Sequence, residues 1–202
     1  VGNTIRFLKN ICGLWLIQQS RRYWKAGGED IAYSKMASFA SEAEPFRSLI
    51  DPDSPLFIEE GRMPEKIQQY CTKSGQPVPE TKGQIIRCIY ESLALRYAEV
   101  WEKLLQYTDT PPKTLHIVGG GCQDKLLNQF TANAIGIKVA ACPVEATSLG
   151  NILVQMMSDG AIKDLKEGRE IILNSSLVER YEPEAQEIWD AQKERFAELS
   201  SR

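Results

Sequence analysis

Three consecutive glycines at positions 119–121 are the residues best placed to do chemistry, because they follow a short apolar run that ends at Val118. Glycine has no Cβ, so the backbone can take a positive φ and a ligand can approach it closely. The amides that open the next helix would point outward, which suits an anion or a nucleotide. The run is not a Walker phosphate loop, since no Gly-Lys-Ser/Thr follows, and not G-x-G-x-x-G, since position 124 is Asp.

The carboxylate of Asp124 narrows the chemistry that this turn could do. A negative charge at the start of a helix disfavours a triphosphate that lies directly on that helix end. We therefore expect the glycine turn to contact adenine, ribose or the α-phosphate of a nucleotide rather than its γ-phosphate. The alternative is that the glycines only make a tight turn between a strand and a helix, because a bare glycine run is a weak motif.

The cysteines and the single histidine form no metal-binding pattern. No two of the five cysteines make a C-x-x-C pair and His116 is the only histidine, so the sequence predicts no zinc site. Scattered thiols are typical of a reducing compartment, which favours the cytoplasm. Cys71 and Cys88 fall on two predicted helices joined by a loop that can reverse the chain. We expect these two thiols to be neighbours, either packed as free thiols or joined as a disulfide.

Hydrophobic periodicity predicts a succession of helices followed by short strands. The clearest helix starts after a T-x-x-Q capping box at Thr81 and Gln84 and continues to about Tyr107. Beyond it, a β-type run stops on the glycines, and a helix, a strand and another helix follow, which is α/β organisation. The predicted helices span residues 7–24, 31–43, 63–73, 81–107, 123–135, 145–157 and 182–199, and the predicted strands span residues 115–118 and 137–141.

The composition is that of an ordinary globular protein, which we interpret as one domain over residues 1–202. A formal net charge of −3 without a basic stripe argues against a nucleic-acid-binding protein. No apolar run approaches the roughly 18 residues that a membrane-spanning helix needs. We therefore expect neither nucleic acid nor a membrane as a partner. The first residue is Val1 rather than Met, and we expect the chain to be a piece of a longer protein.

Two blocks of sequence resemble the nucleotide-binding segments of the FGGY carbohydrate kinases. Residues 116–123 and 126–129 are similar to the adenosine-contacting segment of that family, and residues 143–151 resemble its Glu-Ala-Thr-x-Leu-Gly block. The resemblance extends from the first residues to past Gly150. The stretches that most resemble the members acting on L-rhamnulose are residues 6–11, 13–16, 88–89, 91–95 and 119–123.

The resemblance implies that this chain is the C-terminal half of a two-domain sugar kinase, with the α/β fold of actin-like, ribonuclease-H-like ATPases. The N-terminal domain of the same protein would be its partner and would carry the catalytic aspartate and the loops that hold the phosphates of ATP with Mg²⁺. The implied reaction is the phosphorylation of L-rhamnulose to L-rhamnulose 1-phosphate by ATP. The alternatives are a member of the family that acts on xylulose, fuculose or glycerol, and a non-catalytic nucleotide-binding module of the same fold.

The resemblance also implies roles for particular residues. Asn10 is similar to a sugar-contacting residue, and Asp124 lies where many members carry an asparagine beside adenine. Gly120 is similar to the position where the backbone comes closest to adenosine. From the residues alone, Asn10 could instead be a helix N-cap, and Gln18 could be a solvated helix position. The resemblance implies neither a catalytic residue nor a metal ligand in this chain, and the implied nucleotide-binding residues are Gln18, Gly119, Gly120, Gly121 and Asp124.

Overall fold

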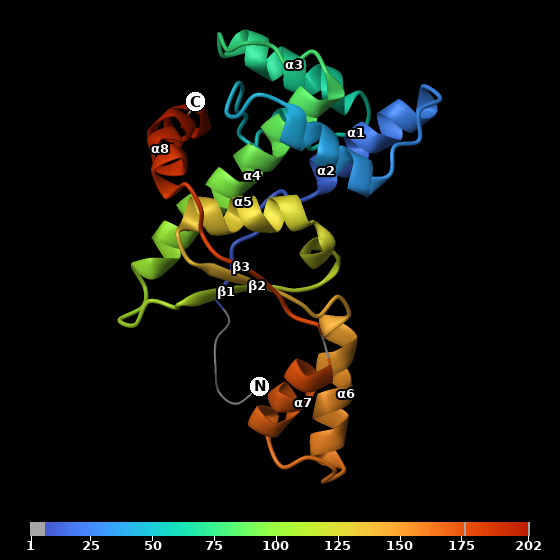
Figure 1. Cartoon of the computed structure of the whole chain (residues 1–202), viewed down its shortest axis with the longest axis vertical. Helices are drawn as coiled ribbons and strands as arrows, with labels where there is room; N and C mark the ends of the chain where they lie inside the picture. The colour runs from blue at the N-terminus through green and yellow to red at the C-terminus, as the bar shows by residue number, and fades with distance from the viewer. Residues whose placement is uncertain (1–6, 176, 202) are drawn as a thin grey trace. The chain divides into compact units, whose positions relative to one another are not determined.

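A computed structural model describes residues 7–175 and 177–201 of the chain (Figure 1). The chain divides into two compact units, of which the first holds residues 7–109 and 187–201 and the second holds most of residues 110–186. Arg6, which belongs to one of the resembling stretches, lies outside the described residues. Each unit is described below by itself.

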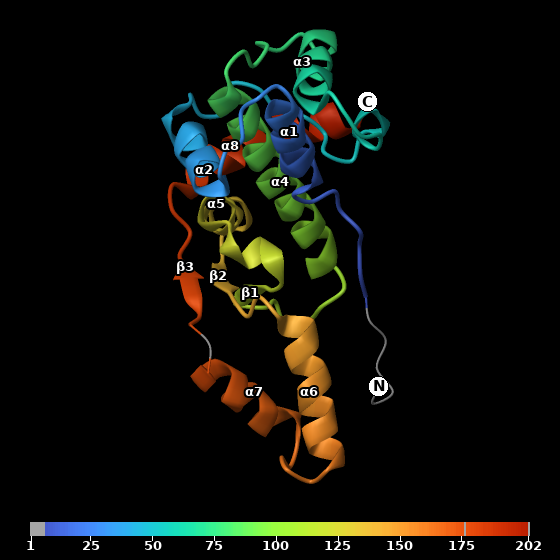
Figure 2. The same cartoon turned by 90° about the vertical axis from the view of Figure 1, so that its right-hand side faces the viewer.

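The first unit is helical and is built around one long helix, α4 (Figure 2). Thr81 caps this helix as predicted: its hydroxyl accepts from the backbone N–H of Gln84, and the Gln84 side chain accepts from the backbone N–H of Thr81. Buried side chains occur on nearly every turn of α4 up to Ala98, so this helix forms the centre of the core. The helices of the first unit are α1 (Trp15–Ala26), α2 (Tyr33–Glu42), α3 (Met63–Lys73), α4 (Lys82–Leu105) and α8 (Gln186–Ser200), with a short 3-10 helix at Pro55–Phe57.

Helix α2 approaches the first turn of α4 closely, and this approach requires a glycine. A Cβ added at Gly83 would lie 2.4 Å from the carbonyl oxygen of Phe39, which is far shorter than a van der Waals contact. Glycine at position 83 lowers the helix propensity of α4, but it lets the backbones of α2 and α4 pack against each other.

A carboxylate is buried inside the first unit. The Glu91 side chain is 1% exposed; its Oε1 accepts from Arg87 Nε at 2.7 Å and its Oε2 from the backbone N–H of Phe46 at 2.8 Å. Arg195 of α8 donates in turn to the carbonyl oxygen of Phe46 at 2.7 Å. Burial raises the pKa of Glu91 to about 7, although the hydrogen bonds and charges of Arg87 and the other donors act in the opposite direction.

The second unit is an α/β unit with a three-stranded sheet in the order β1-β2-β3. Strands β1 and β2 are parallel, with Thr114 opposite Lys138, and β3 pairs with β2 in the antiparallel direction. Helix α5 connects the two parallel strands, and α6 and α7 pair with each other beyond the sheet (Figure 2). The elements are β1 (Thr114–Ile117), a 3-10 helix at Gly120–Gln123, α5 (Lys125–Ile135), β2 (Lys138–Ala141), α6 (Ala146–Ser158), α7 (Leu165–Ser175) and β3 (Glu179–Tyr181).

Most of the predicted elements are confirmed, but both ends of the chain differ from the prediction. The first helix begins at Trp15 rather than at Phe7, because residues 7–13 form neither a helix nor a strand. The last helix begins at Gln186 rather than at residue 182, because the residues before it form β3 and a connecting loop. The sequence interpretation missed both α7 and β3.

Candidate functional site

The glycine turn lies where the two parallel strands end. β1 stops at Ile117, Gly119 takes a φ of 81°, and Gly120 opens a 3-10 helix that leads into α5. The prediction that the glycines join a short strand to a helix at one edge of the sheet is confirmed, since β1 is an outer strand. In open α/β sheets, ligands bind outside the carboxyl ends of the parallel strands, and the turn occupies this place.

Backbone and side-chain hydrogen bonds fasten this turn. The N–H of Gly119 donates to the carbonyl oxygen of Pro143 at 3.0 Å, which joins the end of β1 to the segment after β2. On the other side, the amide Nδ2 of Asn128 donates to the carbonyl oxygen of Cys122 at 2.8 Å. Asn128 is 1% exposed. The sequence interpretation missed this anchoring role, although a polar residue on the buried face of α5 was its signal.

The space next to the glycines is open. A Cβ added at Gly119, Gly120 or Gly121 would meet no atom within 4 Å. Gly119 needs to be glycine because its φ lies in the left-handed region. Gly120 and Gly121 have neither a positive φ nor a crowded neighbour, so the fold of this unit gives no reason for glycine at these two positions. Glycine at these two positions does leave room for a ligand to lie against the backbone.

Asp124 has a structural role at this turn. It is the N-cap of α5, and its Oδ1 accepts from the backbone N–H of Leu127 at 3.1 Å. A carboxylate at this end also stabilises the helix dipole. The contact with adenine that the resemblance implies for Asp124 stays a prediction beside this observed role.

The second resembling block forms the start of α6. This helix begins at Ala146 after Glu145, and no side chain caps its first turn. Thr147 and Ser148 are exposed there, and Gly150 has no atom within 4 Å of an added Cβ. The uncapped amides of α6 therefore follow shortly after Pro143, which bonds to the glycine turn.

Asn10 and Gln18 belong to the first unit, whereas the glycines and Asp124 belong to the second. Asn10 is exposed in the segment before α1, and α1 has Leu14 as its N-cap, so the alternative of Asn10 as a helix N-cap is wrong. Gln18 is an exposed position of α1 between the buried side chains of Ile17 and Gln19. This placement fits a ligand contact and a solvated position equally.

The thiols of the chain are free. Cys71 and Cys88 are buried neighbours: the hydrogen bond from Cys88 lowers the pKa of Cys71, and the same bond raises the pKa of Cys88. Of the two predicted outcomes, the structure has packed thiols rather than a disulfide. Beside the glycine turn, burial, followed by the nearby Cys142 and Glu179, raises the pKa of Cys122, which makes this thiol a poor nucleophile.

Residues 7–175 and 177–201 contain no group of three or more His, Cys, Asp or Glu side chains that could hold a metal ion. In the same part of the chain, every helix is too short or too polar to cross a membrane.

Comparison with known proteins matches residues 1–158 to the FGGY family of carbohydrate kinases, C-terminal domain. The rhamnulokinase of Bacteroides thetaiotaomicron is 48% identical over 191 residues, which are 95% of this chain and 39% of that protein. The rhamnulokinase of Enterococcus faecalis is 43% identical over 182 residues, which are 89% of this chain and 36% of that protein. The chain thus spans about two fifths of the length of these relatives.

A solved structure shares the fold. The xylulose kinase from Rhodospirillum rubrum aligns over 93% of this chain and 37% of its own, with a TM-score of 0.63 and 19% sequence identity.

Proposed function

Because the chain belongs to the FGGY family of carbohydrate kinases and carries the family's C-terminal domain, we propose that it is the nucleotide-binding part of a kinase that phosphorylates a ketose with ATP. Two relatives that are 48% and 43% identical to it are rhamnulokinases. We therefore propose L-rhamnulose as the substrate and L-rhamnulose 1-phosphate as the product. The whole of residues 1–202 would act as one functional part of this enzyme, in the cytoplasm.

The observation that carries this proposal is the open space at Gly120 and Gly121. Neither glycine is needed for the backbone conformation or for packing, yet both lie at the carboxyl end of a parallel strand. A missing Cβ at such a place lets adenosine lie directly against the backbone. We assign Gly119, Gly120 and Gly121, with Asp124, to the adenosine side of the nucleotide.

We assign the remaining roles from the family resemblance. Gln18 would contact the nucleotide and Asn10 the sugar, both from exposed positions. Mg²⁺ and the ATP phosphates would be held mainly by the part of the protein outside this chain, as the family resemblance implies. That part would be the partner of this chain and would supply the aspartate that takes the proton from the sugar hydroxyl.

The chemical contribution of this chain is positioning. Phosphoryl transfer depends on holding the two reactants in line and on stabilising the charge on the transferred group. The glycine turn would hold the adenosine end of ATP, so that the γ-phosphate at the other end meets the sugar in one orientation. Closure of two domains over the substrates would also exclude water, which protects ATP from hydrolysis.

The test uses the full-length protein, assayed with ATP and a panel of ketoses. Replacing Gly120 with Val should raise the KM for ATP by about tenfold, because an added side chain that overlaps another group typically costs about 1–3 kcal/mol. Gly27→Val is the matched control, since Gly27 has an ordinary φ and lies outside the glycine turn. An unchanged KM for ATP in the Gly120 variant would refute the adenosine assignment.

The same panel separates the alternatives. Activity on xylulose, fuculose or glycerol, but not on rhamnulose, would agree with the family assignment but refute L-rhamnulose as the substrate. The absence of any kinase activity, together with the absence of an aspartate at the base position upstream, would favour a non-catalytic nucleotide-binding module.

A further inference from the structure

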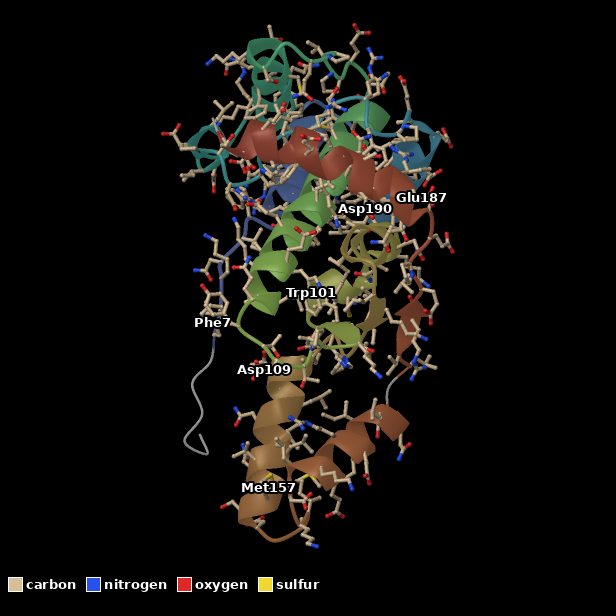
Figure 3. The ribbon with its side chains drawn as sticks, turned by 90° about the vertical axis from the view of Figure 1, so that its left-hand side faces the viewer. Phe7, Trp101, Asp109, Met157, Glu187 and Asp190 are labelled. Atoms are coloured by element: carbon tan, nitrogen blue, oxygen red, sulfur yellow. The ribbon has the colours of Figure 1, made fainter. Side chains whose placement is uncertain are left out.

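The segment of residues 7–13 forms neither a helix nor a strand, so it presents Asn10 without the support of either. At its start lies Phe7, which is labelled in Figure 3. Its ring is 5.1 Å from the ring of Tyr107, just beyond the end of α4. Near its end, the backbone N–H of Cys12 donates to Oδ1 of Asp53 at 2.8 Å. Asp53 follows Cys12 by 41 residues, so a distant loop holds this segment.

The carboxylate that accepts this bond is itself fixed from two directions. Arg96 of α4 places its Nε 3.0 Å from Oδ2 of Asp53, and its Nη2 donates to Oδ1 of Asp51 at 2.8 Å. The same oxygen of Asp51 accepts from the backbone N–H of Asp53 at 3.1 Å. The Arg96 side chain is only 13% exposed, so water screens these interactions weakly.

The same two carboxylates also act on the thiol of Cys12. Burial, then the charges of Asp53 and Asp51, raise the pKa of its thiol to about 11, so this thiol stays protonated at neutral pH. The thiol therefore has no nucleophilic role here, and the backbone N–H is the group through which Cys12 acts.

We propose that Asp53 is a positioning residue for substrate binding: by holding the N–H of Cys12, it fixes the backbone that presents Asn10. Cys12 follows Asn10 by two residues, which span at most about 7 Å. A displacement of the backbone at Cys12 therefore also displaces Asn10. The inference rests on the binding role proposed for Asn10. Without the bond, the segment would sample several conformations, and Asn10 would meet its ligand in only some of them.

The experiment uses the full-length enzyme and begins with Asn10→Ala, which should raise the KM for the sugar, because Asn10 is assigned to the sugar. Asp53→Ala removes the acceptor and should raise the same KM by about tenfold while leaving the other KM unchanged, since a misplacement of 1 Å can cost up to ~100-fold. Asp53→Asn keeps an acceptor oxygen for Cys12 and should restore most of the binding.

Asp51→Asn is the matched control, because it weakens the interaction with Arg96 but leaves the bond to Cys12. It should stay close to the wild type in both KM values. A rise in both constants in Asp51→Asn and Asp53→Ala alike would mean a general loss of structure and would overturn the positioning role.

Amide hydrogen exchange of residues 8–13 gives a second readout in the same proteins. Exchange at Cys12 should be faster in Asp53→Ala and close to the wild type in Asp53→Asn. If Asn10→Ala raises a KM but Asp53→Ala changes neither that KM nor the exchange, this inference alone fails. If Asn10→Ala changes neither KM, the binding role of Asn10 in the proposed function fails, and the positioning role fails with it.

Discussion

Replacing Glu91 with Gln should flatten the dependence of the chain's stability on pH. The carboxyl of Glu91 is almost wholly buried, and burial raises its pKa from 4.5 to about 7. The folded state therefore binds the proton more tightly than the unfolded state. The protonated carboxyl of Glu91 therefore stabilises the folded state. This contribution is fully present below pH 4.5 and is lost as the pH rises to about 7.

The size of this loss follows from the shift. Each pKa unit corresponds to about 1.4 kcal/mol, so Glu91 should lower the free energy of unfolding by about 3 kcal/mol between pH 4.5 and pH 7.5. The side-chain amide of the Glu91→Gln variant cannot ionise, so this contribution disappears from the variant. Other groups titrate equally in both proteins and cancel in the difference.

The assay is urea denaturation of the chain at several pH values between 4.5 and 7.5, followed by tryptophan fluorescence. Trp189 is a suitable reporter, because its ring packs edge-on against Phe46, 4.8 Å away, and Phe46 donates to Glu91. Glu99→Gln is an informative control. The pKa of Glu99 is lowered, because hydrogen bonds from Lys103 and Arg96 outweigh its partial burial, so its effect should have the opposite sign.

One result would refute the reasoning about Glu91. If the wild type gains stability relative to Glu91→Gln as the pH rises, then the ion pair with Arg87 outweighs burial, and the carboxyl is ionised in the folded state at all these pH values. Parallel curves for the two proteins would mean that the group does not change its protonation on folding.

The sequence predicted those parts of the fold whose signals are local. The capping box at Thr81 and Gln84 and the following apolar stripe predicted α4, and the structure confirms both. The glycine run predicted the turn between a strand and a helix for the same reason, since the φ of Gly119 is a property of one residue. The α/β fold of the family's C-terminal domain is confirmed by the solved sugar kinase.

Features that depend on distant partners could not be predicted in this way. Residues 7–13 carry apolar side chains at helical spacing, but the N–H of Cys12 bonds to Asp53 instead of to a preceding turn, so the helix begins later. Strand β3 has three residues and exists because it pairs with β2. In the candidate site, the glycines were visible in the sequence, whereas the anchoring amide of Asn128 has its partner six residues away on another element.

Substitutions at three positions test the helix caps and packing by urea denaturation. Thr81→Ala should destabilise the chain by about 1 kcal/mol because it removes the N-cap, and Thr81→Ser should keep most of it. Gly83→Ala should destabilise by about 1–3 kcal/mol, since the new Cβ overlaps the carbonyl of Phe39 and forces α2 away. Gly150→Ala, on an open part of α6, should instead stabilise by up to ~1 kcal/mol through helix propensity. Gly83→Ala and Gly150→Ala each add one Cβ to a helical glycine, but only the first meets a neighbouring backbone, so shifts of the same sign would contradict the close approach of α2 to α4.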